Sequence, residues 1–216
     1  MNTEDKHNQS LSFMGEITAS VTHELNNVLG TIEQVTGLIE DLAAVDFAQN
    51  SEIAGKLLDV VEKVARQSDR GTSLIKRLNR FAHLNDEPFG EYNIAELLET
   101  MIYLSERAAK MNKVELVAGT IDRDIIIGIR PLATAKEIYD VIKLGIRLAN
   151  PSEKVEIDLH PCDNGGEVIV GFHLNPESEV DVANIQTNIA EDDLPYQLSG
   201  VGDTGRMKIT LSITES

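Results

Sequence analysis

The feature that most constrains the fold is a run of apolar residues near the N-terminus, spaced alternately by four and three positions. It lies between Met14 and about Val45 and consists of Val21, Leu25, Val28, Ile32, Val35, Ile39 and Leu42. This heptad spacing is typical of a long helix that packs along one seam against another helix. The polar residues 1–10 that precede it are predicted to form a disordered tail.

The same spacing returns after a break at VDFAQNSE and predicts a second long helix. Its members are Ile53, Leu57, Val60 and Val64, then Leu74, Leu78 and Phe81, with Gln67 and Gly71 interrupting the series and Pro88 and Gly90 ending it. Together the two helices predict an antiparallel hairpin over residues 11–88. The wide apolar stripe favours a second hairpin as its partner, which would make a four-helix bundle in a homodimer. The alternative is that the hairpin packs on the C-terminal half of its own chain.

Residues 89–216 alternate between helical and strand patterns and predict an α/β sandwich, so that the whole chain is of the α+β class. IAELLETMIYLSERAAKM and ATAKEIYDVIKLGIRLAN are predicted helices, and VELVAGTI, DIIIGI and RMKITLSI are predicted strands. KVEIDLH and EVIVGFHL flank PCDNGG, which predicts a β-hairpin with an Asn-Gly turn. EVDVANIQTNIAEDDLPYQLSG is poorly patterned and predicts at most one weak helix. The sequence gives no role for residues 175–199.

Charge and composition exclude several classes of function. The chain has 216 residues and a formal charge of −17, which argues against binding to nucleic acid or to an anionic membrane surface. A single cysteine, Cys162, excludes an intramolecular disulfide and a metal site with several Cys ligands. His160 with Cys162 makes too small a ligand set, so no metal site is predicted. Without a membrane span or a signal peptide in the sequence, a cytoplasmic protein is expected.

The stretch SVTHELNNVLGTI places residues in mid-helix that a helix has no structural reason to choose. His23 falls at the heptad position farthest from the seam, so it should face solvent, with Asn27 one turn further on. Asn26 and Asn27 together, and then Gly30, are costly in a helix interior. A lone exposed His usually has no role. This one has an adjacent carboxylate, Glu24, and nearby small residues that let a partner approach. Phosphoryl transfer through the imidazole fits, because a neutral ring nitrogen is a nucleophile near pH 7.

The stretch THELNNVLGTI resembles the H-box of the bacterial sensor histidine kinases, and YNIAELLETMIYLSERAAKMNKVEL is similar to the start of their ATP-binding domain. The resemblance implies that His23 carries the phosphoryl group on a helical hairpin that dimerises into a four-helix bundle. It matches the family's pattern at His23, Glu24 and Asn27.

The resemblance weakens at the nucleotide site. Where the family has its Mg²⁺-binding Asn, this chain has Val141 and Gly145, and Asn150 is better explained as a helix cap. CDNGGE is explained by the hairpin turn, and HLNPES stands where the adenine box should be. GVGDTGRMKITL resembles the last Gly-rich box, but its end alternates like a strand. The sequence therefore predicts a kinase ATP-binding fold over residues 89–216 without its ATP chemistry.

Together these features resemble the bacterial histidine phosphotransferases that are built like a shortened kinase. The resemblance implies transfer of a phosphoryl group between receiver-domain aspartates through His23, with Glu24 activating it and Asn27 and Asn26 orienting the transferring group or a water. Partners would be response-regulator receiver domains and, as a further candidate, a hybrid histidine kinase. The chain would need no cofactor of its own, since the receiver supplies Mg²⁺. Two alternatives stay open: an autophosphorylating kinase with a divergent nucleotide site, and a non-catalytic module that binds a kinase or receiver.

Overall fold

The computed structural model describes residues 3–43, 51–175, 196–201 and 206–215. By contacts the chain divides into two compact units, Met14–Ala82 and a second made of Met1–Phe13 with His83–Ser216. The first, a helical unit, lies within the predicted hairpin of residues 11–88, and the second holds the α/β part predicted for residues 89–216. None of the helices in the described ranges combines the length and the apolar character that crossing a bilayer requires.

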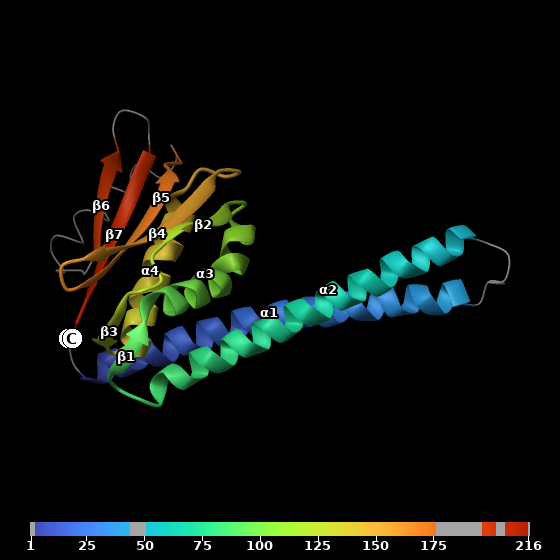
Figure 1. The fold of residues 1–216 in the computed structure, drawn as a ribbon, viewed down its shortest axis with the longest axis horizontal. Coiled ribbons are helices and arrows are strands. Elements are labelled where there is room, and N and C mark those ends of the chain that lie inside the picture. The colour runs from blue at the N-terminus through green and yellow to red at the C-terminus, as the bar shows by residue number, and fades with distance from the viewer. Residues whose placement is uncertain (1–2, 44–50, 176–195, 202–205, 216) are drawn as a thin grey trace. The chain divides into compact units, whose positions relative to one another are not determined.

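The helical unit is an antiparallel hairpin of two long helices, α1 (Thr3–Ala43) and α2 (Ser51–Ala82) (Figure 1). Val21 and Val28 of α1 and Val60 and Leu74 of α2 are buried, so the predicted seam lies where the two helices face each other. The predicted tail over residues 1–10 is wrong from Thr3 onward, because α1 begins there. No Pro or Gly interrupts residues 3–14, so the helix of the seam extends back toward the N-terminus.

Gly71 packs closely against a side chain of α1. A Cβ built at this position would lie 3.2 Å from Val28 Cγ1, which is tighter than most side-chain contacts. In the sequence pattern, Gly71 interrupts the apolar series of the second helix. In the structure it is a buried seam position at which the absence of a side chain lets Val28 approach the α2 backbone.

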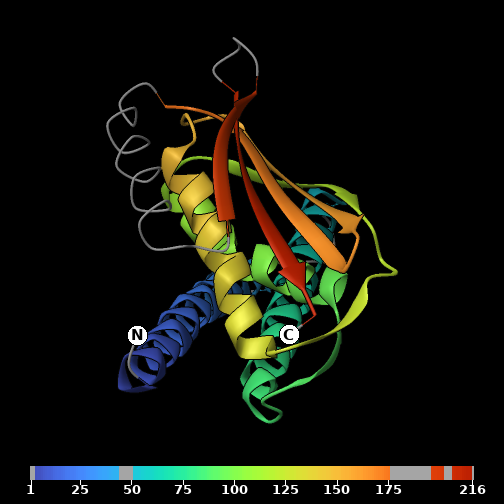
Figure 2. The ribbon, with the colours of Figure 1, turned by 90° about the vertical axis from the view of Figure 1, so that its left-hand side faces the viewer.

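The α/β unit is a mixed five-stranded sheet with two helices, α3 (Ile94–Met111) and α4 (Pro131–Leu148), on one face (Figure 2). The strands, in sheet order, are β2 (Glu115–Ile121), β4 (Lys154–Cys162), β5 (Gly165–His173), β7 (Arg206–Thr214) and β6 (Tyr196–Val201). Among the strands of the described residues, β2 with β4 is the one parallel pair. β1 (Gly90–Asn93) and β3 (Ile126–Ile129) form a separate antiparallel pair.

The core of this unit is aliphatic, as the composition predicts, and lies between the sheet and the two helices. Alternate residues of β4, β5 and β7 are fully or almost fully buried, among them Val155, Ile157, Val168, Ile209 and Leu211. This period of two is what a sheet with one covered face produces. The helix α3 begins where Asn93 Oδ1 accepts a hydrogen bond from Glu96 N at 3.2 Å, which satisfies a free amide of the first turn.

Several sequence expectations for this unit are confirmed and others need correction. Helix α3 has the predicted bounds, and β7 is the predicted last strand. The predicted Asn-Gly turn is displaced by one residue, because Cys162 pairs with Gly165 and leaves Asp163 and Asn164 as the turn. Strands β1 and β6 were not predicted. The weak helix suggested for the segment before β6 falls on residues 176–195, outside the described residues.

Candidate functional site

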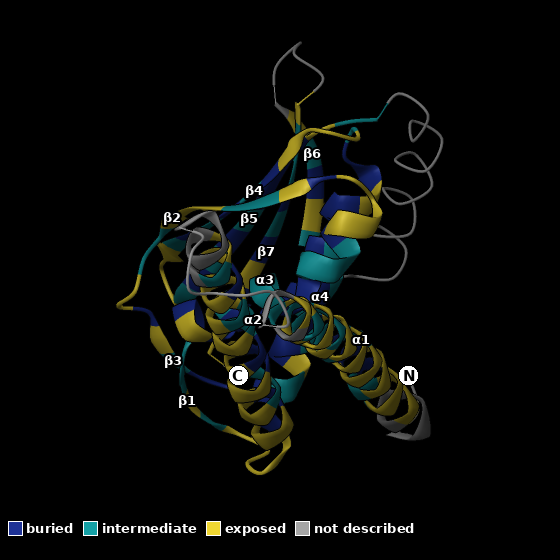
Figure 3. Ribbon diagram, turned by 90° about the vertical axis from the view of Figure 1, so that its right-hand side faces the viewer, coloured by how far each residue is buried: buried dark blue, intermediate teal, exposed yellow. Residues whose placement is uncertain are grey.

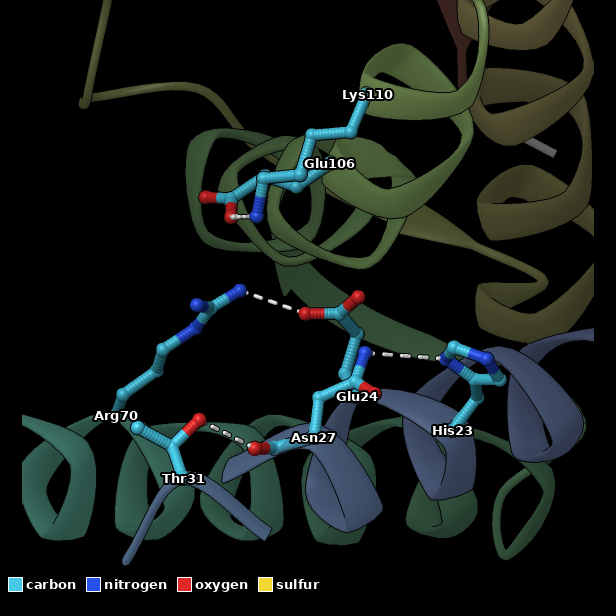
Figure 4. A network of polar contacts seen from close by, with 7 residues as sticks. All are labelled: His23, Glu24, Asn27, Thr31, Arg70, Glu106 and Lys110. Carbon is cyan, nitrogen blue, oxygen red and sulfur yellow. Dashed lines mark hydrogen bonds and ion pairs between the residues drawn. The ribbon is translucent and has the colours of Figure 1, made fainter. Parts of the chain in front are cut away.

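His23 lies on the exposed side of α1, as its heptad position predicts. Its ring is held from one turn further along the helix, where Asn27 Nδ2 lies 3.2 Å from His23 Nδ1 (Figure 4). The i, i+4 spacing brings the two side chains onto the same helix surface. Asn27 is itself exposed, and its backbone carbonyl oxygen accepts a hydrogen bond from Thr31 Oγ1 at 2.8 Å.

The amide of Asn27 can set which ring nitrogen of His23 is reactive. With Nδ2 donating to Nδ1, the neutral ring carries its proton on Nε2. With the amide rotated by half a turn, Oδ1 accepts from Nδ1–H and Nε2 carries the lone pair. In both orientations Asn27 engages Nδ1. Nε2 is therefore the ring nitrogen open to an incoming electrophile, and it carries the lone pair for attack in the second orientation, with Oδ1 accepting from Nδ1–H.

Glu24 points to the other helix of the hairpin. Its Oε2 accepts a hydrogen bond from Arg70 Nη2 at 2.6 Å, and the Glu24 side chain is largely buried there (Figure 4). The sequence predicts that Glu24 activates the imidazole. The structure gives the carboxylate a partner on α2 instead, because residue 24 flanks the seam, where coiled coils form interhelical salt bridges.

Asn26 is exposed and lies on the surface beside Asn27. The small residues around the site also keep the surface open. Ala19 is exposed, and a Cβ at Gly30 would meet nothing within 4 Å. Of the predicted site residues, Asn27 contacts His23 in the structure. Glu24 instead contacts Arg70, a residue that no sequence pattern indicated. The flanking heptad position of Glu24 indicates a cation on the facing helix, without selecting Arg70 from the several cations there.

The place of the family's Mg²⁺-binding Asn is closed in this chain. Val141 and Gly145 are buried where α4 packs on the sheet. A Cβ at Gly145 would come within 2.6 Å of Val170 Cγ1 and would also touch Phe172 and Val155. An amide side chain therefore does not fit at position 145, and an Asn at position 141 would bury its amide among apolar side chains. These residues do not fit a nucleotide-bound metal. Asn150 lies one residue beyond the end cap of α4, and its backbone N donates to His173 O at 2.8 Å.

Strands and the turns between them explain part of the two Gly-rich segments, CDNGGE and GVGDTGR. CDNGGE contributes the ends and the turn of the β4–β5 hairpin. In GVGDTGR, Gly200 and Val201 belong to β6 and Arg206 to β7, and Val201 pairs with Arg206. Gly202 and Gly205 fall outside the described residues. Within the described ranges, no three or more His, Cys, Asp or Glu side chains gather as metal ligands would.

No model of a protein family matches the sequence, and no curated protein matches it. Among solved structures, a bacterial phosphotransferase superimposes with a TM-score of 0.52 at 11% identity, over 94% of this chain and 96% of that chain. The cytoplasmic segment of the histidine kinase QseC gives a TM-score of 0.44 at 15% identity, over 68% of this chain and 95% of that one. The Acinetobacter baumannii histidine kinase AdeS gives 0.43 at 11% identity, over 89% and 97%. The chain therefore has the fold of the bacterial phosphotransferase, a helical region followed by an α/β sheet.

Proposed function

We propose that the protein is a histidine phosphotransferase that carries a phosphoryl group on His23 between the aspartates of receiver domains. The observation that carries the proposal is the exposed imidazole of His23, held through Nδ1 by Asn27 on an otherwise regular helix. A donor as large as a receiver domain needs an exposed acceptor, and a ring fixed at one nitrogen presents the other in a constant direction.

The phosphoryl transfer requires no general base from this chain. With Nδ1–H donating to Asn27 Oδ1, the Nε2 lone pair attacks the phosphorus of an aspartyl phosphate, and the acyl-oxygen–phosphorus bond breaks. The aspartate leaves as a carboxylate, and the phosphorylated ring keeps its Nδ1 proton and a positive charge. The side-chain oxygen of Asn27, Oδ1, stabilises that charge as it forms. Passage to a second receiver is the reverse of the same step.

Mg²⁺ would come with the receiver domain, whose partner aspartate lies in its own acidic pocket. The tight packing around Gly145 supports a metal supplied by the receiver, because a nucleotide-bound metal would find no amide ligand at this position. The same packing disfavours the alternative of an autophosphorylating kinase.

A homodimer fits the surface of the hairpin. Leu29 and Leu38 of α1 and Val61 and Ile75 of α2 are between 45% and 57% exposed, on helices whose mutual seam is already buried. Figure 3 shows how much of the outer surface of both helices is exposed. A second hairpin packed on these residues would form a four-helix bundle with two His23 sites.

The decisive experiment offers the protein phosphorylated receiver domains and measures radiolabel on each chain. We expect acid-labile label on the wild-type chain and none on His23→Gln, with Glu16→Gln as a matched exposed control on the same helix that keeps the label. Acid-labile label from Mg-ATP alone, lost in His23→Gln, would instead make the protein an autokinase. Receiver binding without label on any variant would make it a non-catalytic binding module.

A further inference from the structure

A stripe of cationic side chains runs along one face of α2. Its members recur at alternating intervals of three and four residues, with Ser73 filling the one neutral position, so they share one side of the helix. We define the basic stripe as Lys63, Arg66, Arg70, Arg77 and Arg80. At a rise of 1.5 Å per residue it extends about 25 Å. Lys63, Arg66 and Arg80 are exposed, and Arg70 and Arg77 are half-buried.

The stripe has the opposite sign to the rest of the chain. Residues 63–80 contain six basic residues, the sixth being Lys76, and one acidic residue, Asp69, which gives a local charge of +5. Since the whole chain carries −17, the remaining residues carry −22. Two of its cations are paired with carboxylates outside this window, Arg66 with Glu62 and Arg70 with Glu24, and counting both carboxylates leaves a surplus of +3. A positive surface in such an acidic protein attracts an anionic partner.

The middle of the stripe lies beside the phosphoryl-accepting site. Arg70 bonds Glu24, the residue that follows His23 in the chain, so the stripe passes α1 at the level of His23 (Figure 4). A partner that reaches His23 with an acidic surface would meet cations both toward Lys63 and toward Arg80.

We propose that the basic stripe is the docking surface for the acidic face of a phosphorylated receiver domain, an inference that rests on the proposed function. The receiver must bring to His23 a phosphorylated aspartate and the carboxylates that hold its Mg²⁺. The acidic remainder of this chain repels such a surface, so attraction has to come from a local patch of the opposite sign. The stripe supplies that attraction and fixes the orientation of the receiver along α2.

The test removes three exposed charges of the stripe that lie outside the His23 contacts, in the variant Lys63→Gln/Arg66→Gln/Arg80→Gln. The matched control, Lys110→Gln/Lys113→Gln/Lys154→Gln, removes three exposed charges from the α/β unit. Transfer is measured from a panel of receiver domains phosphorylated with acetyl phosphate, as a function of receiver and salt concentration. We expect the KM of the stripe variant to rise about tenfold at low salt, with a flatter salt dependence and an unchanged kcat. The control should match the wild type in all three.

The outcomes separate the two proposals. A stripe variant with the wild-type KM and salt dependence overturns the docking surface and leaves phosphotransfer standing. A wild-type chain that accepts no phosphoryl group from any receiver overturns the proposed function. Tight binding of a short DNA duplex that the stripe variant loses would overturn the docking proposal in favour of nucleic acid. Circular dichroism and urea denaturation of both triple variants establish that a raised KM does not reflect unfolding.

Discussion

The carboxylate of Glu24 lies 2.6 Å from the guanidinium of Arg70 on the opposite helix of the hairpin. The residue next to the candidate phosphoryl acceptor therefore ties α1 to α2. The Glu24 side chain thus links the two helices of the hairpin, and the direct contact with the ring of His23 comes from Asn27.

Removing either member of this pair should destabilise the hairpin. We expect Glu24→Ala and Arg70→Ala each to lower the free energy of unfolding by about 1 kcal/mol, because a half-buried, charge-assisted hydrogen bond is lost. The double variant should cost less than the sum of the two, as measured by urea denaturation in a double-mutant cycle. Glu62→Ala, which removes an exposed pair with Arg66 at 3.4 Å, should change stability little. Additive losses would argue against a direct pair.

Asn27→Ala should free the ring of His23 without harming the fold. Both residues are exposed, and Ala is a better helix former than Asn, so the helix should gain about 0.5 kcal/mol. Transfer through His23 should slow, since the Nδ1 partner is gone. Nitrogen-15 NMR of the ring should show a changed ratio of the two neutral tautomers. Asn26→Ala is the neighbouring control. An unchanged tautomer ratio in Asn27→Ala would contradict the assigned contact.

Gly71 and Gly30 offer a matched comparison of two glycines in long helices. Gly30→Ala should stabilise the protein by about 1 kcal/mol, because its Cβ meets nothing within 4 Å. Gly71→Ala should gain less, since its Cβ lies 3.2 Å from Val28 Cγ1, and Gly71→Leu should destabilise by about 2 kcal/mol through overpacking. Thermal and urea unfolding measure all three. Equal gains for the two alanine variants would place Gly71 away from the seam.

Placing on α4 the Asn that the resemblance to histidine kinases implies should destabilise the fold instead of creating a metal ligand. The side chain of Gly145→Asn would collide with Val170, and Val141→Asn would bury an amide among apolar groups, so each should cost about 2 kcal/mol or more. Arg147→Asn, an exposed position on the same helix, is the control and should cost only its helix propensity. Differential scanning fluorimetry with and without Mg-ATP provides the readout. A stabilised Gly145→Asn variant that gains affinity for nucleotide would refute the closed site.

Glu137 should make the fold more stable as the pH falls. Burial raises the pKa of its carboxyl above the ordinary value, with Asp140 adding to the rise and Lys136 opposing it. The ionised form is therefore disfavoured in the folded state, and this cost is present above the raised pKa and disappears below the ordinary pKa. Glu137→Gln should be more stable than the wild type at pH 7, and the difference should vanish near pH 4. Exposed Glu91→Gln is the control. The melting temperature against pH is the measurement.

Local patterns predicted much of the fold. The heptad spacing predicts a paired α1 and α2, and α3 has its predicted bounds because Asn93 caps its first turn and its apolar residues face one side. Strand β6 escaped prediction because YQLSGV has little alternation of its own and pairs only with β7 at the edge of the sheet. Edge strands of this kind depend on a partner that the local sequence does not describe.

The contacts of the candidate site within α1 could be predicted from the sequence, and the contact with α2 could not. Helical spacing alone places His23 outward and Asn27 above it, since both belong to one surface of α1. The partner of Glu24 is 46 residues away in the chain, and no local pattern selects Arg70 from the other cations of α2. The tight packing at Gly145 was likewise hidden, because Val170 belongs to β5.

The contact between Phe13 and Tyr139 has a practical consequence for dissecting the molecule. The two rings lie 5.4 Å apart by their centroids, both are almost fully buried, and Phe13 groups with the α/β unit although it comes from the first turns of α1. A fragment that starts at His83 would leave Tyr139 uncovered and would lack a piece of its own interior. The α/β unit is thus discontinuous in sequence, and an intact copy of it requires both ends of the chain.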